Sequence, residues 1–214
     1  MFNIRKYSTI LFDLDDTIYS EIEYLKHAFG QIARDISTKE PALKSNDIEK
    51  FLVSTFLTEG RQNLYQKMLN HFAIAPDYKL EDFLKGLRHV VIAEDSIPVF
   101  PFIEIFINHY HDQFSFFIVT NGNKDQQENK FRSIALPYKH RFKIIYCNLF
   151  GEKRKKPSAY FINYLEEQYG ISREKTLFIG DGDVDKVAAI NGGIDFLYVK
   201  DFEKYVHYFV DLLK

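Results

Sequence analysis

The stretch Ser8–Thr17, STILFDLDDT, decides the fold of this chain. A continuous apolar run is followed at once by a group of acids. Such a run is typical of a strand that is buried on both faces, as in a parallel sheet covered by helices. Acids that follow the strand directly lie at its carboxyl end, which is where open α/β sheets bind their ligands. The stretch therefore predicts a parallel sheet with a polar site at one edge.

Short apolar runs of the same kind recur later in the chain, and helical patterns separate them. The later strands are expected at Phe114–Thr120, Phe142–Cys147, Thr176–Gly180 and Ile194–Val199, and helices at Lys124–Ala135, Ser158–Gly170 and Asp183–Asn191. Strands that alternate with helices of this length are typical of βαβ units. We therefore expect an α/β fold with a Rossmann-like, doubly wound parallel sheet.

One long segment, between Glu21 and Ala93, has no strand pattern. Its apolar residues follow helical spacing: Ile22, Leu25, Phe29, Ile32 and Ile36; Ile48, Phe51, Leu52 and Phe56; Leu64, Met68, Leu69 and Phe72; Leu80, Phe83, Leu84, Leu87 and Val91. Proline restricts the residue before it, so Ile97–Pro98 marks a boundary. We predict a helical cap, residues 20–97, inserted into a discontinuous core formed by residues 1–19 and 98–214.

Size and composition exclude several classes of protein. A length of 214 residues predicts one or two domains, and 46% hydrophobic with 27% charged residues excludes disorder, collagen and coiled coils. With 28 basic and 30 acidic residues the net charge is −2, so we expect no nucleic acid or membrane as partner.

Targeting signals and cysteine usage indicate the compartment. The single cysteine, Cys147, excludes an internal disulfide framework and fits a reducing compartment. The first apolar run is short and ends in acid, unlike a signal peptide, and Ile97–Ile107 is too short to span a bilayer. We expect a soluble cytoplasmic protein, either a monomer or a homodimer.

Aspartates are concentrated in two places. Six of the 16 fall within Asp13–Thr17 and Asp181–Asp185, and each group follows a predicted strand. Helix capping explains one acid per loop, but not Asp13, which still lies in the strand-end run. Two like charges 4 Å apart cost about 1 kcal/mol in water and about 4 kcal/mol at an effective dielectric of 20. A divalent cation removes this cost, and Mg²⁺ is the usual one where phosphate is handled.

A basic run and a polar turn complete the candidate site. Lys156 lies next to Pro157 at the start of a predicted helix, so we place it in the site, whereas Lys153–Lys155 fits a solvated loop. The tripeptide Thr120-Asn121-Gly122 follows a predicted strand. Its hydroxyl, carboxamide and backbone N–H groups suit a phosphate, although the same tripeptide is also typical of a simple turn.

Together these residues resemble the haloacid dehalogenase (HAD) superfamily. Its four motifs occur in order: Asp13-Leu14-Asp15-Asp16-Thr17, Thr120, Lys156-Pro157, and Gly180-Asp181 through Asp185. The inserted helices match the helical cap that the family places between the first two motifs. Segments 120–130 and 59–63 are also similar to capped, pyrimidine-nucleotidase-like members.

The resemblance implies a role for each acid. Asp13 would be the nucleophile that forms an aspartyl phosphate, and Asp15 the general acid and then the general base. The metal ligands for Mg²⁺ would be Asp13, the backbone carbonyl of Asp15, and Asp181. Asp185 would orient Lys156 or metal-bound water. Asp183 has no role in the family and is expected to be a charge at a helix N-terminus.

Other residues would bind the substrate. By the resemblance, Thr120 and the backbone of Asn121 and Gly122 would hold phosphoryl oxygens, and Lys156 would balance the charge on nucleophile and phosphate. Arg61 lies in a polar break between two cap helices. It is expected either to reach over the site and bind substrate or to be solvated.

Asp15 indicates which chemistry to expect, because dehalogenases of the superfamily lack this second acid and phosphonatase-type members replace it. The resemblance therefore implies a Mg²⁺-dependent phosphomonoesterase, and the cap implies a small phosphorylated metabolite as substrate. A nucleotide, a sugar phosphate and flavin mononucleotide all stay open. The alternatives are a phosphosugar mutase and a catalytically inactive HAD-fold binding protein. A receiver domain is disfavoured because Cys147-Asn148 lacks its aspartate.

Overall fold

A five-stranded parallel sheet forms the centre of the molecule. The computed structural model describes residues 3–74 and 78–212, with side chains as far as residue 208. The strands are β1 (Thr9–Phe12), β2 (Ser115–Thr120), β3 (Phe142–Tyr146), β4 (Thr176–Gly180) and β5 (Asp195–Tyr198). Their order is β3-β2-β1-β4-β5, and every neighbouring pair is parallel. The predicted doubly wound α/β fold is confirmed, and β1 is its central strand.

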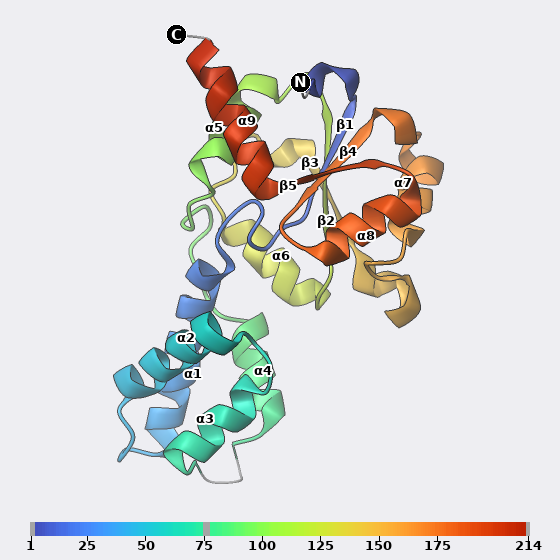
Figure 1. The fold of residues 1–214 in the computed structure, drawn as a ribbon. Coiled ribbons are helices and arrows are strands. Elements are labelled where there is room, and N and C mark those ends of the chain that lie inside the picture. Colours follow the sequence, from blue (N-terminus) through green and yellow to red (C-terminus); the bar gives the residue numbers. More distant parts are fainter. Residues whose placement is uncertain (1–2, 75–77, 213–214) are drawn as a thin grey trace.

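Helices cover both faces of the sheet (Figure 1). The core helices are α5 (Pro101–Tyr110), α6 (Lys124–Ser133), α7 (Tyr160–Tyr169), α8 (Asp183–Gly192) and α9 (Val199–Leu212). Ile10 and Phe12 of β1 belong to the apolar cluster that includes α5 and α9, whereas Leu11 belongs to the cluster of α7 and α8. Alternate residues of β1 thus face opposite layers, which explains its unbroken apolar run.

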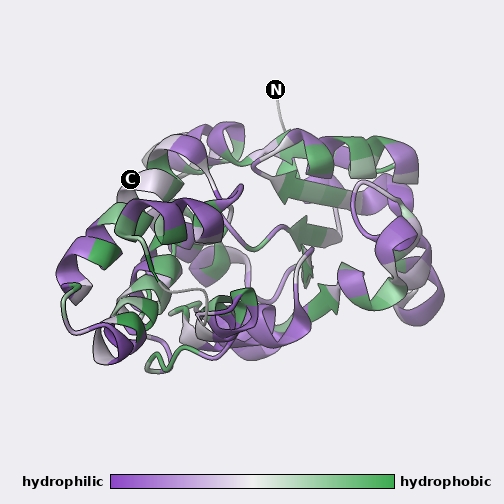
Figure 2. Cartoon of the chain, turned by 90° about the horizontal axis from the view of Figure 1, so that it is seen from below, coloured by the Kyte–Doolittle hydropathy of each residue, from purple (hydrophilic) through white to green (hydrophobic). Residues whose placement is uncertain are grey.

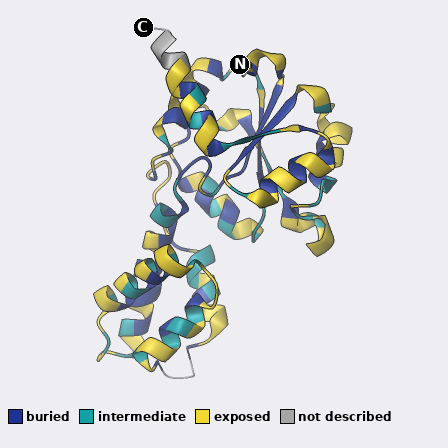
Figure 3. Ribbon diagram, viewed as in Figure 1, coloured by how far each residue is buried: buried dark blue, intermediate teal, exposed yellow. Residues whose placement is uncertain are grey.

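Burial and hydropathy follow these layers. The strands are mostly apolar and buried, while the outer faces of the helices are polar and exposed (Figures 2 and 3). Short 3₁₀ helices occupy the connections: Ile4–Lys6, Lys139–Arg141, Cys147–Phe150, Glu152–Arg154 and Arg173–Lys175. No helix within the described part of the chain is both long and apolar enough to cross a membrane.

Four helices form a separate group beside one end of the core (Figure 1). They are α1 (Glu21–Lys39), α2 (Ser45–Glu59), α3 (Leu64–Phe72) and α4 (Leu80–Arg88). Helix α1 packs against α2 and α4. The approach of α4 is close, because a Cβ at Gly86 would lie 2.5 Å from Ile32 Cγ1. Val91, which the helical spacing included, lies beyond α4 and is 86% exposed.

Two chain segments connect the four helices to the core, and these segments contact each other. The N–H of Phe100 donates to the carbonyl of Ile18 at 2.9 Å. Helix α4 also contacts the core helix α6. Asn129 Nδ2 of α6 donates to the Arg88 carbonyl at the end of α4 at 3.3 Å and to the Val90 carbonyl, just beyond that helix, at 2.8 Å. The cap therefore contacts the core through α6 as well as through its connections. The limits at residues 20 and 97 stay a prediction.

Candidate active site

Asp13 and Lys156 form the centre of the site. Asp13 follows β1 directly, and its N–H extends the pairing with β4 by donating to Ile179 at 2.9 Å. The Nζ of Lys156 lies 2.6 Å from Asp13 Oδ1 and 2.7 Å from Asp185 Oδ1, and it donates to the Val119 carbonyl at 2.9 Å. Burial lowers the pKa of Lys156, but the charges of Asp13 and Asp185 outweigh it and raise that pKa. Lys156 is thus a buried ammonium group between two carboxylates.

Three acids converge around this lysine. Asp13, Asp181 and Asp185 each present a carboxylate oxygen, and these oxygens all lie within 4.8 Å of one another. Burial, and then the charge of Asp185, raises the pKa of Asp13 to about 7 and that of Asp181 to about 6, although Lys156 lowers both. The raised pKa values thus reflect burial first and the neighbouring carboxylates second. A donor set made only of oxygens, with more carboxylates than lysines, fits a hard divalent cation such as Mg²⁺.

Asp15 has a different environment, because its carboxylate is held by three donors. Lys130 Nζ lies 2.9 and 2.8 Å from its two oxygens, Gln127 Nε2 donates at 3.0 Å, and Tyr19 Oη donates at 2.8 Å. Burial acts to raise the pKa of Asp15. The charge of Lys130, together with the hydrogen bonds from all three donors, outweighs burial and holds that pKa below its ordinary value. The first-motif acids therefore lie in two distinct charge environments.

Lys130 also contacts the cap. Its Nζ donates to Glu21 Oε1 at 2.6 Å, and both side chains are buried. The charge of Asp15 adds to burial in raising the pKa of Glu21, while Lys130 and Arg61 oppose this rise. One ammonium group thus pairs with two carboxylates, Asp15 in the loop after β1 and Glu21 at the start of the cap helix α1.

Sequence reasoning assigned no role to Lys130, Gln127, Tyr19 or Glu21. A signal for two of them was present, since Gln127 and Lys130 are three residues apart in a predicted helix and therefore share one face. That helix directly follows Thr120, which places this face at the carboxyl edge of the sheet. For Glu21 and Tyr19 the sequence carries no comparable signal.

The polar turn after β2 has mostly internal partners. Thr120 Oγ1 accepts from Gln127 Nε2 at 2.6 Å. The Asn121 side chain donates to the Lys156 carbonyl at 2.9 Å and accepts from the Lys156 N–H at 3.0 Å. The Gly122 N–H, expected to face phosphate, donates to Asn148 Oδ1 at 2.9 Å. Asn121 therefore fixes the backbone that carries Lys156, and the Gly122 N–H is engaged by Asn148 in this structure.

Arg61 lies at the outer end of the charged contacts. Its Nη2 lies 2.5 Å from Glu21 Oε2, while 73% of its side chain is exposed. A continuous series of alternating charge therefore runs from Arg61 through Glu21 and Lys130 to Asp15. Arg61 is neither simply solvated nor in contact with Asp13.

The remaining charged residues have local partners. Asp16 Oδ1 accepts from the Glu21 N–H at 2.9 Å, so this acid caps α1. Asp183 lies in the first turn of α8, as expected for a helix N-terminal charge, and accepts from Tyr198 Oη at 2.6 Å. Lys153 and Arg154 are exposed.

The chain matches the family model of haloacid dehalogenase-like hydrolases over residues 10–199. It therefore belongs to this family, as its four motifs predicted. The matched residues include Asp13 and Asp15 of the first motif and the whole acidic group that follows β4. The finer placement beside pyrimidine-nucleotidase-like members stays a prediction.

Solved structures share the fold. The HAD-hydrolase YfnB from Bacillus subtilis, crystallised with magnesium, is 23% identical, with 90% of this chain and 88% of that one covered and a TM-score of 0.58. A subfamily IA hydrolase from Geobacter sulfurreducens is 15% identical (89% and 86% covered, TM-score 0.57). A defluorinating L-2-haloacid dehalogenase is 12% identical (90% and 80% covered, TM-score 0.57). No curated protein matches the chain. Likeness at these identities shows the fold alone.

Proposed function

We propose that this hydrolase is a Mg²⁺-dependent phosphomonoesterase that cleaves a small phosphorylated metabolite through an aspartyl phosphate. The observation that carries the proposal is the separation of Asp13 from Asp15. Asp13 lies with Lys156 and the acidic group, whereas Asp15 lies with Lys130, Gln127 and Tyr19. Carboxyl groups in contrasting environments are typical of sites that divide nucleophilic from acid–base work.

Mg²⁺ would be held by Asp13, Asp181 and the backbone carbonyl of Asp15. When bound, it supplies positive charge that favours the ionised nucleophile and offsets the charge of the phosphate. Lys156 adds a positive charge next to Asp13 Oδ1, and Asp185 orients that lysine. The hydrogen bond from Lys156 thus fixes the orientation of the Asp13 carboxylate before the substrate binds.

The reaction proceeds in two displacements. An Asp13 oxygen attacks phosphorus, the bond from phosphorus to the alcohol oxygen breaks, and that oxygen takes a proton from Asp15. Water then attacks phosphorus and gives its proton to Asp15, and the bond between phosphorus and Asp13 breaks to release phosphate. Each proton transfer by a positioned group is worth about 10²–10⁴ in rate.

Lys130 affects these two steps differently. By favouring the ionised form of Asp15, it suits the second displacement, in which Asp15 accepts a proton from water. The first displacement needs the protonated form, which this contact disfavours. A leaving group that is stable as an anion avoids the conflict, so aryl esters should react faster than alkyl esters of similar size.

A substrate screen tests the proposal. Phosphate release from a set of phosphomonoesters is measured with Mg²⁺ and with EDTA, and halide release from L-2-chloropropionate is measured in parallel. We expect phosphate release that depends on Mg²⁺, and no halide release. Halide release without phosphate release would instead assign the chain the activity that its dehalogenase-like neighbours carry in their names.

A further inference from the structure

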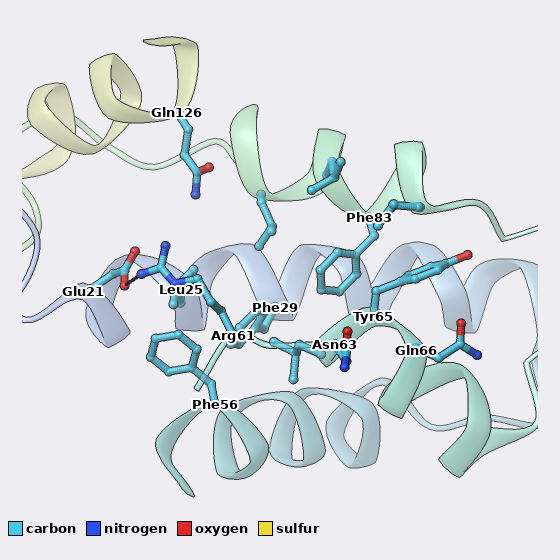
Figure 4. A pocket seen from close by; sticks show the side chains of 14 residues that line it. Glu21, Leu25, Phe29, Phe56, Arg61, Asn63, Tyr65, Gln66, Phe83 and Gln126 are labelled. Atoms are coloured by element: carbon cyan, nitrogen blue, oxygen red, sulfur yellow. Dashed lines mark hydrogen bonds and ion pairs between the residues drawn. The ribbon is translucent and has the colours of Figure 1, made fainter. Parts of the chain in front are cut away.

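The cap contains a pocket of about 570 Å³ between its helices. Glu21, Arg61 and Gln126 lie at one end and Asn63 and Gln66 toward the other, and the wall between them is largely apolar (Figure 4). The apolar wall includes Leu25, Phe29, Phe56, Phe83, Leu84 and Leu87. The volume of the pocket lies within the range of ordinary small-molecule sites, about 300–1,000 Å³.

The polar end of the pocket adjoins the proposed active site. Glu21 lines the pocket and shares Lys130 with Asp15. Gln126 also lines it and immediately precedes Gln127, which donates to Asp15. The pocket is therefore separated from the proposed acid/base by one shared side chain, Lys130.

The direction of the substrate follows from the proposed chemistry. Asp15 protonates the leaving oxygen, so the alcohol part of the ester lies on the Asp15 side of phosphorus. On that side Asp15 contacts Lys130, and Lys130 contacts the cap helix α1 through Glu21. The alcohol part is thus directed toward the mouth of the pocket.

We propose that this pocket takes the alcohol part of the substrate, and that this part is an apolar body, aromatic or aliphatic, rather than a sugar or polyol. The inference rests on the proposed function. Each hydroxyl of a sugar would leave water and find no partner along the Phe and Leu wall, which is unfavourable. The N–H donors of Arg61 and Gln126 lie at the mouth and those of Asn63 and Gln66 toward the far end, so polar atoms of the substrate belong at its two ends and not along the wall between them.

A matched pair of primary alkyl phosphates tests this inference on the unmodified enzyme. One is 4-phenylbutyl phosphate, and the other is 2-(2-methoxyethoxy)ethyl phosphate, a flexible ether with a similar leaving group. We expect kcat/KM to be about tenfold or more higher for the phenylbutyl ester, the range that apolar pocket contacts supply. Equal values, or a preference for the ether, would overturn the inference while leaving the phosphatase proposal intact.

A pocket-filling variant locates the effect. Leu84→Trp narrows the pocket, so it should remove the preference for the phenylbutyl ester over the ether. Leu57→Trp is the matched control, since Leu57 is 63% exposed and is not part of the pocket wall. A preference that survives Leu84→Trp would place the apolar contact elsewhere and overturn the assignment to this pocket. The wild-type comparison does not depend on how the variant folds.

Binding of the free alcohol separates this inference from the proposed function. Saturation-transfer NMR with 4-phenylbutanol should show binding to wild-type protein and to Leu57→Trp, and its loss in Leu84→Trp. If the alcohol binds in this way but no phosphomonoester is hydrolysed, the proposed function fails and the pocket assignment holds. If esters are hydrolysed but the alcohol does not bind, the pocket assignment fails and the phosphatase stands.

Discussion

The buried ammonium group of Lys130 lies 2.6 Å from Glu21 Oε1, and this contact ties the core helix α6 to the cap helix α1. The same group contacts both oxygens of Asp15. One side chain thus contributes both to the contact between cap and core and to the orientation of the proposed acid/base. A change at either carboxylate is transmitted to the other through Lys130.

Replacing this lysine should destabilise the fold strongly. Lys130→Met leaves Asp15 and Glu21 buried without their shared cation, and breaking a buried pair costs about 3–5 kcal/mol. Urea unfolding, followed by circular dichroism, measures the loss.

Two controls accompany this experiment. Adding Glu21→Gln to Lys130→Met removes one uncompensated charge and should restore part of the stability. Lys124→Met, on the same helix, removes only a half-exposed pair with Glu128 and should cost no more than about 0.5 kcal/mol. Equal losses from Lys124→Met and Lys130→Met would contradict the central role of the buried lysine.

Substitution of Asp13 and substitution of Asp15 should impair catalysis in different ways. Asp13→Asn removes the nucleophile, so both turnover and phosphoenzyme should vanish. Asp15→Asn leaves the nucleophile, and p-nitrophenolate departs without a proton, so p-nitrophenyl phosphate should still phosphorylate Asp13. Hydrolysis of the aspartyl phosphate should then be slowed by about 10²–10⁴-fold, because no base deprotonates water.

Rapid quench and mass spectrometry distinguish these outcomes. We expect Asp15→Asn to show one burst of p-nitrophenolate per site and one added phosphoryl group on a peptide that contains Asp13. Burst-free turnover of this variant at nearly the wild-type rate would remove Asp15 from the mechanism.

Activity should depend on a divalent cation held at the acidic group. EDTA should abolish turnover, and added Mg²⁺ should restore it, because Asp13, Asp181 and a phosphate dianion repel one another without a cation. Asp181→Asn should raise the Mg²⁺ concentration that gives half-maximal activity. Asp183→Asn changes an acid that contacts Tyr198 instead, so it should leave this concentration unchanged. Full activity in EDTA would refute the metal site.

Without metal, stability should depend on pH through Asp13. Burial, and then the charges of Asp185 and Asp15, raises its pKa from 3.8 to about 7 against the attraction of Lys156. Between these values the folded protein binds more protons at Asp13 than the unfolded chain does. Its contribution to stability is therefore full below pH 3.8 and is lost as the pH rises through 7.

Comparison with Asp13→Asn isolates this contribution. Urea unfolding in EDTA at each pH gives the free energy of unfolding of both proteins. Relative to wild type, the free energy of unfolding of Asp13→Asn should rise as the pH increases from about 4.5 to 7.5. Mg²⁺ should reduce the pH dependence of this difference in stability, because the cation favours the ionised form of Asp13. A difference that stays constant in EDTA would show that Asp13 does not titrate in this range.

Arg61 should affect substrate choice but not metal use. It lies at the mouth of the cap pocket and contacts Glu21. Arg61→Ala should therefore change the ranking of substrates by kcat/KM while the requirement for Mg²⁺ persists. Lys67→Ala, which removes a cap-surface pair with Glu59, should leave the ranking unchanged. If the ranking is also unchanged in Arg61→Ala, Arg61 serves only to pair with Glu21.

Local sequence patterns predict the sheet, the helices after most strands and the meeting of Asp13, Lys156 and Asp181. These features follow from local patterns, because a buried strand needs an unbroken apolar run and parallel strands bring their carboxyl ends to one edge. Helix α5 was missed as a helix. The prolines at positions 98 and 101 indicate a boundary between cap and core. Pro101, however, occupies the first position of the helix, where proline favours a helix start.

Which charges are buried depends on long-range contacts that local sequence patterns do not reveal. Lys130 follows a polar helical pattern, so its sequence context resembles that of a solvent-exposed lysine. It is buried because Glu21 and Asp15, 109 and 115 residues away, converge on it. A buried charge needs partners that compensate for the loss of water, and the partners of Lys130 come from one distant stretch, residues 15–21. The division between Asp13 and Asp15, and the position of Arg61, depend on the same long-range contacts.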